Sequence, residues 1–312
     1  MKSLKKYLSP TLLVLAAMIW GLAFSAQDAA TSVPPFTLGA VRSVFATVFL
    51  IFVIISFDKI SNTGRRLFSK KKIIDVNRTE IIGGTLCGAI LAVASFFQQT
   101  GIAGGTEAGK AAFITSLYVV LVPVYAIFFK RRAALNVWIS MPIAVVGFYL
   151  LCITENLSMV FSDVFVLICA LIFPFHILVI DRFSPQCDGI RMSFIQFFVA
   201  SLINATLALI FESPISFSLI GEHIMPLLFL GIGSSGIAYT LQIIGQRGAN
   251  PAAASIIMSL ESVFGVLGSA IFLGEEMLTR EYIGCVILFV AVIISQIDVS
   301  VFKESKGNGD TP

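Results

Sequence analysis

One carboxylate lies in an otherwise apolar part of the sequence. Glu261 falls near the middle of the long apolar segment 251–273. In a bilayer, an acidic side chain at the centre of a helix costs about 2.5–3.5 kcal/mol, so it persists where it faces a cavity, finds a partner or stays protonated. At helical spacing Glu261 shares a face with Met258, Gly265 and Gly268, whose small members allow close approach. Two interpretations follow: a cavity-lining group that binds a substrate cation or a proton, and a structural hydrogen bond to a neighbouring helix.

Arg42 is the basic residue that lies well inside an apolar segment. A buried guanidinium binds the anionic group of a ligand, or it pairs with a carboxylate of the protein. Asp28 is a candidate for such a pair. Both interpretations of Arg42 remain open.

Aromatic and amide side chains recur together at helical spacing on three apolar segments. Such walls suit amphipathic or aromatic substrates through stacking and cation–π contact, and ordinary interhelical packing is the alternative. His176 fits a packing role, because its counterpart Ala23 in the repeat described below is apolar. The stripes consist of Trp20, Phe24 and Gln27, of Phe96 and Gln99, and of Ser235, Tyr239 and Gln242, and we add Tyr118 as the counterpart of Glu261.

The motifs of common catalytic and cofactor sites are missing from the sequence. It contains no HExxH, G-x-S-x-G or Walker motif, and no GxGxxG after a strand. The five cysteines and two histidines have no metal-ligand spacing. We therefore expect no catalytic residue, metal or cofactor. A net charge of only +3 gives no support for a nucleic-acid partner.

Composition predicts an all-α integral membrane protein. Of the 312 residues, 57% are hydrophobic and only 12% are charged, whereas soluble domains carry about 25% charged residues. A helix needs roughly 20 residues to cross the hydrocarbon. The sequence predicts ten transmembrane helices, at residues 10–32, 36–56, 80–101, 107–129, 134–153, 159–180, 190–211, 224–245, 251–273 and 282–302.

The basic residues predict the orientation of these helices. If the N-terminus is cytoplasmic, all but three of the 21 Lys and Arg residues lie on the inner side. The exceptions are Lys110 and Arg280 on the outer side and Arg42 within a span. Because inner loops are enriched in Lys and Arg, we expect both termini to be cytoplasmic in the cell membrane.

The two halves of the chain resemble each other. Sliding residues 81–146 by 143 positions without a gap matches Gly88 to Gly231, Gln99 to Gln242, and Gly105 to Gly248, among others. Each half, 10–153 and 159–303, then holds five helices, so the odd number inverts one half relative to the other. Residues 304–312 are expected to form a disordered cytoplasmic tail. Inverted repeats are typical of secondary transporters.

Three stretches resemble the drug/metabolite transporter superfamily, in particular its ten-helix EamA type. They are 17–24 in the first helix, 109–123 in the fourth, and 272–276 with 283–284 at the end of the ninth and the start of the tenth. The resemblance implies ten helices around a central cavity and export of metabolites, amino acids or toxic compounds. Glu261 departs from it, because many members carry apolar residues followed by a proline there.

These observations predict a secondary transporter that moves small metabolites, amino acids or drug-like compounds across the cytoplasmic membrane by alternating access, with export the expected direction. Its partners would be a small-molecule substrate, membrane lipid, and a proton or another coupling ion. The predicted working unit is a monomer, with a homodimer as the alternative. A channel-like facilitator and a non-transporting membrane receptor are the competing functions.

Overall fold

The computed structural model describes residues 2–61, 76–152, 160–273 and 277–297, and within them the secondary structure is helical. Ten helical segments are long and apolar enough to cross a membrane, which confirms the predicted fold class. The elements are α1 Lys2–Asp28, α2 Pro35–Ser61, α3 Arg78–Ala103, α4 Ala108–Ser116, α5 Tyr118–Phe128, α6 Leu135–Cys152, α7 Phe161–Phe183, η1 Ser184–Gln186, α8 Gly189–Phe211, α9 Phe217–Glu222, α10 Ile224–Leu228, η2 Phe229–Ala238, α11 Tyr239–Gly245, α12 Pro251–Met258, α13 Glu261–Leu273 and α14 Thr279–Gln296.

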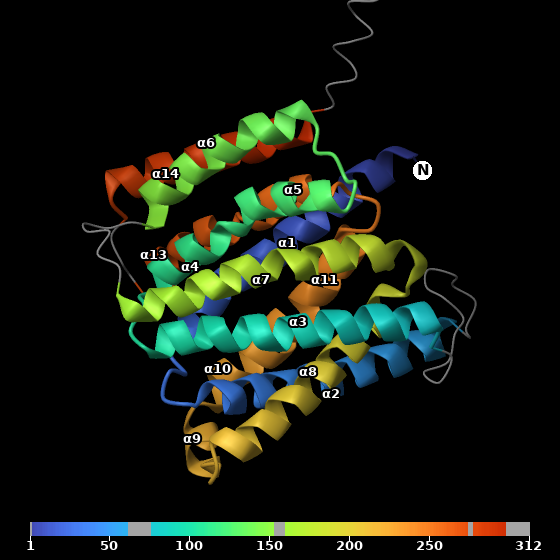
Figure 1. Cartoon of the computed structure of the whole chain (residues 1–312), viewed down its shortest axis with the longest axis vertical. Coiled ribbons are helices and arrows are strands. Elements are labelled where there is room, and N and C mark those ends of the chain that lie inside the picture. The colour runs from blue at the N-terminus through green and yellow to red at the C-terminus, as the bar shows by residue number, and fades with distance from the viewer. Residues whose placement is uncertain (1, 62–75, 153–159, 274–276, 298–312) are drawn as a thin grey trace, which may run out of the picture.

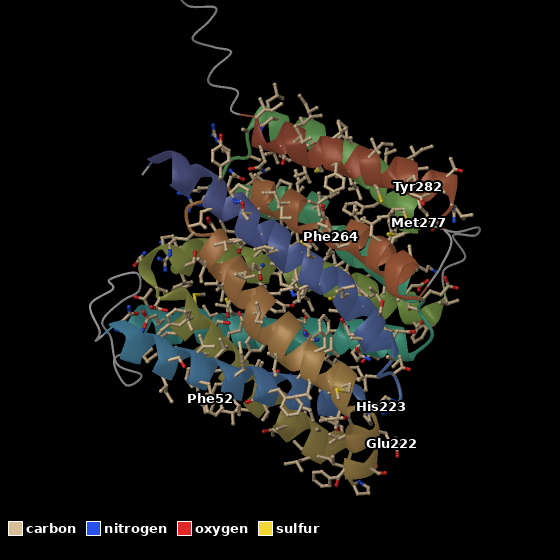
Figure 2. All side chains as sticks on the ribbon, turned by 180° about the vertical axis from the view of Figure 1, so that it is seen from behind. Phe52, Glu222, His223, Phe264, Met277 and Tyr282 are labelled. Carbon is tan, nitrogen blue, oxygen red and sulfur yellow. The ribbon has the colours of Figure 1, made fainter. Side chains whose placement is uncertain are left out.

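The long helices lie side by side with their axes in a similar direction (Figure 1). Helices α6 and α14 pack together at one edge of the molecule, and α2 packs against α8 at the opposite edge. Between the edges, α3 packs on α7 and α8. From behind, α1 crosses the bundle next to α13, η2 and α11 (Figure 2). The centre of the bundle is therefore built from α1, α4, α5, α7, α11, α12 and α13.

Two tight turns connect the central helices, and each depends on a glycine. Gly105 lies between α3 and α4 with φ +102°, and Gly248 lies between α11 and α12 with φ +78°. Residues with a Cβ rarely adopt this left-handed region. Gly105 and Gly248 are also matched positions in the two halves of the sequence, so both halves turn at equivalent places.

Two transmembrane segments are interrupted, again at matched positions. The fourth is divided at Leu117 into α4 and α5, and the ninth is divided at Ser259–Leu260 into α12 and α13. Pro123 follows the first interruption and lacks the N–H that would bond to the Val119 carbonyl. At the second, the Ser259 hydroxyl donates to the Ile256 carbonyl at 2.6 Å, a contact that bends helices.

A close contact between α1 and α13 fixes the second interruption in the bundle. A Cβ added at Gly21 would lie 2.6 Å from both the Glu261 carbonyl oxygen and the Gly265 amide nitrogen. Gly21 in α1 and Gly265 in α13 have no side chains, and this allows the two backbones to approach so closely. The start of α13 is thus held directly against α1.

The observed helix ends differ from the predicted ones mainly at the two ends of the chain. The first helix begins at Lys2, ahead of position 10. The last ends at Gln296, before position 302, because Ile297 adopts extended backbone angles and the Asn136 amide bonds the Ser295 and Ile297 carbonyls at 2.7 and 3.0 Å. The predicted tail, 304–312, lies outside the described residues.

Candidate functional site

The two helix interruptions bring Glu261 and Tyr118 together. Each is the first residue of the segment after its interruption, in α13 and α5 respectively. The Tyr118 hydroxyl donates a hydrogen bond of 3.2 Å to Oε1 of Glu261, and both side chains are buried. Nearby, the Ser116 and Ser262 hydroxyls lie 3.2 Å apart. Tyr118 and Glu261, which match in the two halves of the sequence, therefore meet in space.

Glu261 and Tyr118 line a central chamber of about 30 Å³. A water molecule needs roughly 10–15 Å³ measured in this way, so the chamber has room for about two waters. The lining residues come from α1, α2, α3, α4, α5, α7, η2, α11, α12 and α13. They are Trp20, Ala23, Phe24, Gln27, Arg42, Gln98, Thr115, Tyr118, Phe173, Ile177, Ser234, Tyr239, Gln242, Met258 and Glu261.

Arg42 reaches the chamber from α2 and is held by hydroxyl groups. Its Nε donates to Ser235 Oγ at 3.0 Å and its Nη2 to Ser234 Oγ at 3.2 Å. Both serines belong to η2, a π-helical segment, and such segments occur often at functional sites. Asp28, the suggested partner of Arg42, lines a different cavity, and the hydrogen bonds of Arg42 go to the two serines instead.

Aromatic rings form much of the chamber wall. Trp20 meets Tyr239 edge-on with ring centroids 4.8 Å apart, and Tyr118 stacks near Phe173 at 6.1 Å. These four residues come from α1, α11, α5 and α7. Contacts of this kind stabilise packing and also present ring faces to an apolar or cationic ligand.

Several polar atoms that face this region have no protein partner. The Trp20 indole Nε1 and both amide atoms of Gln242 are buried without a hydrogen bond. Gln246, one turn further along, does not line the chamber, but its amide atoms are also buried without a hydrogen bond. A buried polar group without a partner costs free energy, so water or a ligand is expected at such atoms. The chamber is therefore polar in part and not fully satisfied by the protein.

Two predicted site residues lie behind the chamber wall. Gln99 donates to the Gln27 carbonyl at 3.4 Å and accepts from the Gln27 side chain at 3.3 Å. His176 bonds Gln196 Oε1 through Nε2 at 2.9 Å, and its ring meets Tyr239 edge-on at 5.6 Å. Neither residue lines the chamber. Gln99 contacts the lining residue Gln27, and His176 contacts the lining residue Tyr239, from behind the wall.

A larger cavity of about 540 Å³ runs from the helix ends toward Glu261. It lies between α1, α4 and α13 on one side and α6 and α14 on the other. Phe24 and Glu261 line both this cavity and the central chamber, so the two are adjacent. Asp28, Glu107 and Glu281 also line the larger cavity, and no Lys or Arg is among its described lining residues. Its wall is therefore negatively charged.

Met277 lines this cavity at one end of the bundle, which we call the cavity end (Figure 2). Met277 and Tyr282 lie there together with Glu222 and His223 (Figure 2). We call the opposite end the basic end. There α1 begins, α5, α7 and α11 end, and the described Arg78, Lys130, Arg131, Arg132, Arg182, Arg191 and Arg247 lie.

Bonds between the two halves join helix ends at the basic end. Arg131, after α5, forms a two-point ion pair with Asp181 in α7, at 2.9 and 3.3 Å. The Asn250 amide, before α12, donates to the Arg132 carbonyl at 3.2 Å. The Ser9 hydroxyl in α1 bonds the Gly245 carbonyl in α11. The first two contacts join α5, α7 and α12, which match α13, α1 and α4 around the larger cavity, and the third joins α1 to α11.

Sequence reasoning missed the acidic lining of the larger cavity. Glu107 and Glu281 lie at helix ends, where carboxylates normally face solvent, and nothing in their spacing brings them together. It also missed Ser234, Gln98 and Thr115. The double serine in the glycine-rich stretch 231–236 was the one available signal, since adjacent hydroxyls there are rare.

Among the described residues, no group of three or more His, Cys, Asp or Glu side chains is placed to hold a metal ion. The described cysteines form no disulfide, and all five are buried. The groups in the chamber that could bind a ligand are thus one carboxylate, one guanidinium, hydroxyls, amides and aromatic rings.

The fold and site define a multi-pass membrane protein with a cavity that leads from one end to charged groups at its centre. The EamA-like transporter family model matches residues 8–153 and again 160–296, and the chain belongs to this family. An uncharacterized transporter from Archaeoglobus fulgidus is 29% identical over 293 residues, covering 92% of this chain and 85% of the relative. A protein of known crystal structure superposes with a TM-score of 0.72 at 15% identity, covering 96% of this chain and 99% of that one, and supports the fold alone. The protein is a membrane transporter of the EamA family.

Proposed function

We propose that this transporter is a secondary carrier that exports small metabolites, amino acids or drug-like compounds across the cell membrane by alternating access. One observation carries the proposal. The cavity of about 540 Å³ meets the central chamber at Glu261, while cross-half bonds tie the opposite end. A path open toward one side and closed toward the other is what alternating access requires of a single state.

The repeat in the sequence predicts a second conformation of the protein. The two family matches divide the chain into similar halves, and the matched interruptions at Leu117 and Leu260 meet at the chamber. We infer that the halves are inverted relative to one another and that they exchange conformations. In the exchanged state, Asp181 and Asn250 would line an open path at the basic end, and the cavity end would close.

Glu261 is the proposed coupling group. It lies at the junction of the two cavities, so it can be reached from the cavity end in this state. A single carboxylate can hold a proton or a cationic group of the substrate but not both. Competition of this kind exchanges one for the other across the membrane.

The basic end is proposed to face the cytoplasm. It carries most of the described basic residues, which prefer the inner side of a membrane. Both termini would then be cytoplasmic, and the structure would represent the outward-open state. A single chain contains both halves of the path, so a monomer suffices, and surrounding lipid covers the exposed apolar faces.

The test is transport by the purified protein in liposomes. Candidate compounds are screened by counterflow, in which unlabelled internal compound drives uptake of labelled compound. We expect saturable counterflow for at least one compound class. Flux that rises linearly with concentration and shows no counterflow would indicate a channel. No flux across the panel, with specific binding retained, would indicate a receptor.

A further inference from the structure

A small cavity between α2, α3 and α8 shares one lining residue, Arg42, with the central chamber. Its volume is about 10 Å³, which leaves room for a single species of about the size of a water molecule. Four polar residues line it, and the rest of its described lining consists of glycine, alanine, leucine and phenylalanine. The polar residues are Arg42 and Ser43 in α2, Ser95 in α3 and Asn204 in α8.

The guanidinium of Arg42 is buried without a counter-charge among the described residues. Arg42 is 7% exposed. Its Nε and Nη2 donate to the neutral hydroxyls of Ser235 and Ser234, and no described residue bonds Nη1. Glu261 lines the same chamber, but its hydrogen bond in the described part of the chain joins it to Tyr118, and it forms no ion pair with Arg42 there. Because taking an ion out of water is costly unless an opposite charge is near, a ligand is expected to supply the negative charge.

The other polar groups of the small cavity are hydrogen-bond donors. Ser43 and Ser95 carry hydroxyl protons. The Asn204 amide nitrogen carries two N–H groups, one of which donates to the Ala200 carbonyl at 2.9 Å. No Asp or Glu is among the described lining residues, whereas the larger cavity has carboxylates and no described Lys or Arg. A positive charge surrounded by donors is an arrangement that binds an anion.

We propose that the small cavity binds one monatomic anion, such as chloride, against Arg42. A carboxylate or phosphate group has several heavy atoms and exceeds the space, whereas a water molecule fits but leaves the charge of Arg42 without compensation. The anion joins α2 and α3 of the first half to α8 of the second half. It is a fixed part of the bundle beside the chamber wall, so this site lies beyond the proposed transport path.

The first test is thermal unfolding of the purified protein in sodium chloride, sodium bromide and sodium gluconate at equal ionic strength. Gluconate is too large for the cavity and serves as the reference. Because a ligand that binds only the folded state stabilises it, we expect chloride and bromide to raise the midpoint of unfolding by about 2–4 °C over gluconate. In a crystal grown with bromide, the anomalous signal should place one bromide beside Arg42.

Substitutions in the cavity locate the anion. Arg42→Gln removes the charge, and the double variant Ser95→Ala with Asn204→Leu removes donors that lie outside the central chamber. Both should lose most of the halide shift, and Arg42→Lys should keep part of it. Ser201→Ala is the matched control, because Ser201 is also buried in α8 and lines neither the chamber nor the small cavity. General effects of salt act on all variants alike, so a difference between them belongs to the site.

The outcomes separate this inference from the proposed function. Equal midpoints of the wild type in halide and gluconate would overturn the anion site. A halide shift that survives in the double variant would place the anion elsewhere and overturn the small cavity as its site. If Arg42→Gln does not fold, the double variant and the position of the bromide decide. Counterflow without a halide shift overturns the anion site alone, and a halide shift without counterflow overturns the carrier alone.

Discussion

The two ends of the bundle are built from matching helices but differ in how they are joined. At the cavity end, α1, α4 and α13 stand apart from α6 and α14 around a space of about 540 Å³ lined by Asp28, Glu107 and Glu281. At the basic end, α5, α7 and α12, which match α13, α1 and α4, are joined to one another by Arg131–Asp181 and by Asn250 on the Arg132 carbonyl. Asp28 and Asp181 occupy related places in the two halves, one in an open cavity and one in an ion pair.

This difference between the ends is the basis for the two proposed states. At the basic end, the bonds between the two halves are a few polar contacts at helix ends, whereas the helix interiors are held by apolar packing. Breaking half-exposed polar contacts costs little, so the closed end can open while the helices stay intact. The predictions below test the comparison between the ends.

The largest effect is expected at the junction of the two cavities. Glu261→Gln removes the carboxylate that the proton and the substrate would share, so uptake driven by a pH gradient should be lost. Counterflow at saturating substrate should persist, since it moves no net proton. Both are measured in liposomes, with Glu222→Gln as the control, because Glu222 is exposed and lines neither cavity. If Glu261→Gln shows gradient-driven transport equal to that of the wild type, Glu261 is not the coupling group.

Adding a side chain at the contact between α1 and α13, which positions Glu261, should lower the stability of the protein. Gly21→Ala places a Cβ 2.6 Å from backbone atoms of α13 and should lower the free energy of unfolding by about 1–3 kcal/mol. Gly221→Ala is the matched control, because nothing lies within 4 Å of its added Cβ. Unfolding in detergent with denaturant measures both. Equal stabilities would mean that α1 and α13 are not held together as described.

Accessibility should differ between matched positions at the two ends. Gly109 is exposed at the cavity end, and its counterpart Ala252 is 1% exposed. In a variant without the five native cysteines, Gly109→Cys should react with a polar maleimide about tenfold or more faster than Ala252→Cys. That ratio follows if the second state is populated at about 10% or less. Equal rates would contradict a closed basic end.

The smallest effect is expected at the basic end itself. Asp181→Asn removes the ion pair with Arg131, whose side chain is 54% exposed, so solvent screening limits its contribution to about 0.2–1 kcal/mol. The labelling ratio of Gly109→Cys to Ala252→Cys should fall by up to about fivefold. A charge swap, Arg131→Asp with Asp181→Arg, should recover it. An unchanged ratio in Asp181→Asn would show that other contacts close this end.

Much of the fold could be predicted from the sequence, and less of the site. Hydropathy placed the ten spans within a few residues because a chain in lipid must satisfy its backbone within helices. Glu261 and Tyr118 could be singled out by burial cost and by repeat position, and the structure brings them into contact. Gln99 and His176 were grouped with them, but their side chains point to partners behind the wall. Helical spacing gives the face of one helix, whereas a cavity depends on how several helices pack. The functional roles of these residues stay predictions.

The sequence by itself determined that the chain spans the membrane ten times, that it belongs to its family, and that matched residues recur in two halves, because these follow from composition and order along the chain. Only the tertiary structure decided that Arg42 binds serine hydroxyls, that Arg42 and Glu261 share one chamber, and that three carboxylates from distant segments line one cavity. Those facts depend on how helices far apart in sequence approach one another, and small residues such as Gly21 and Gly265 set that approach through contacts that no local pattern encodes.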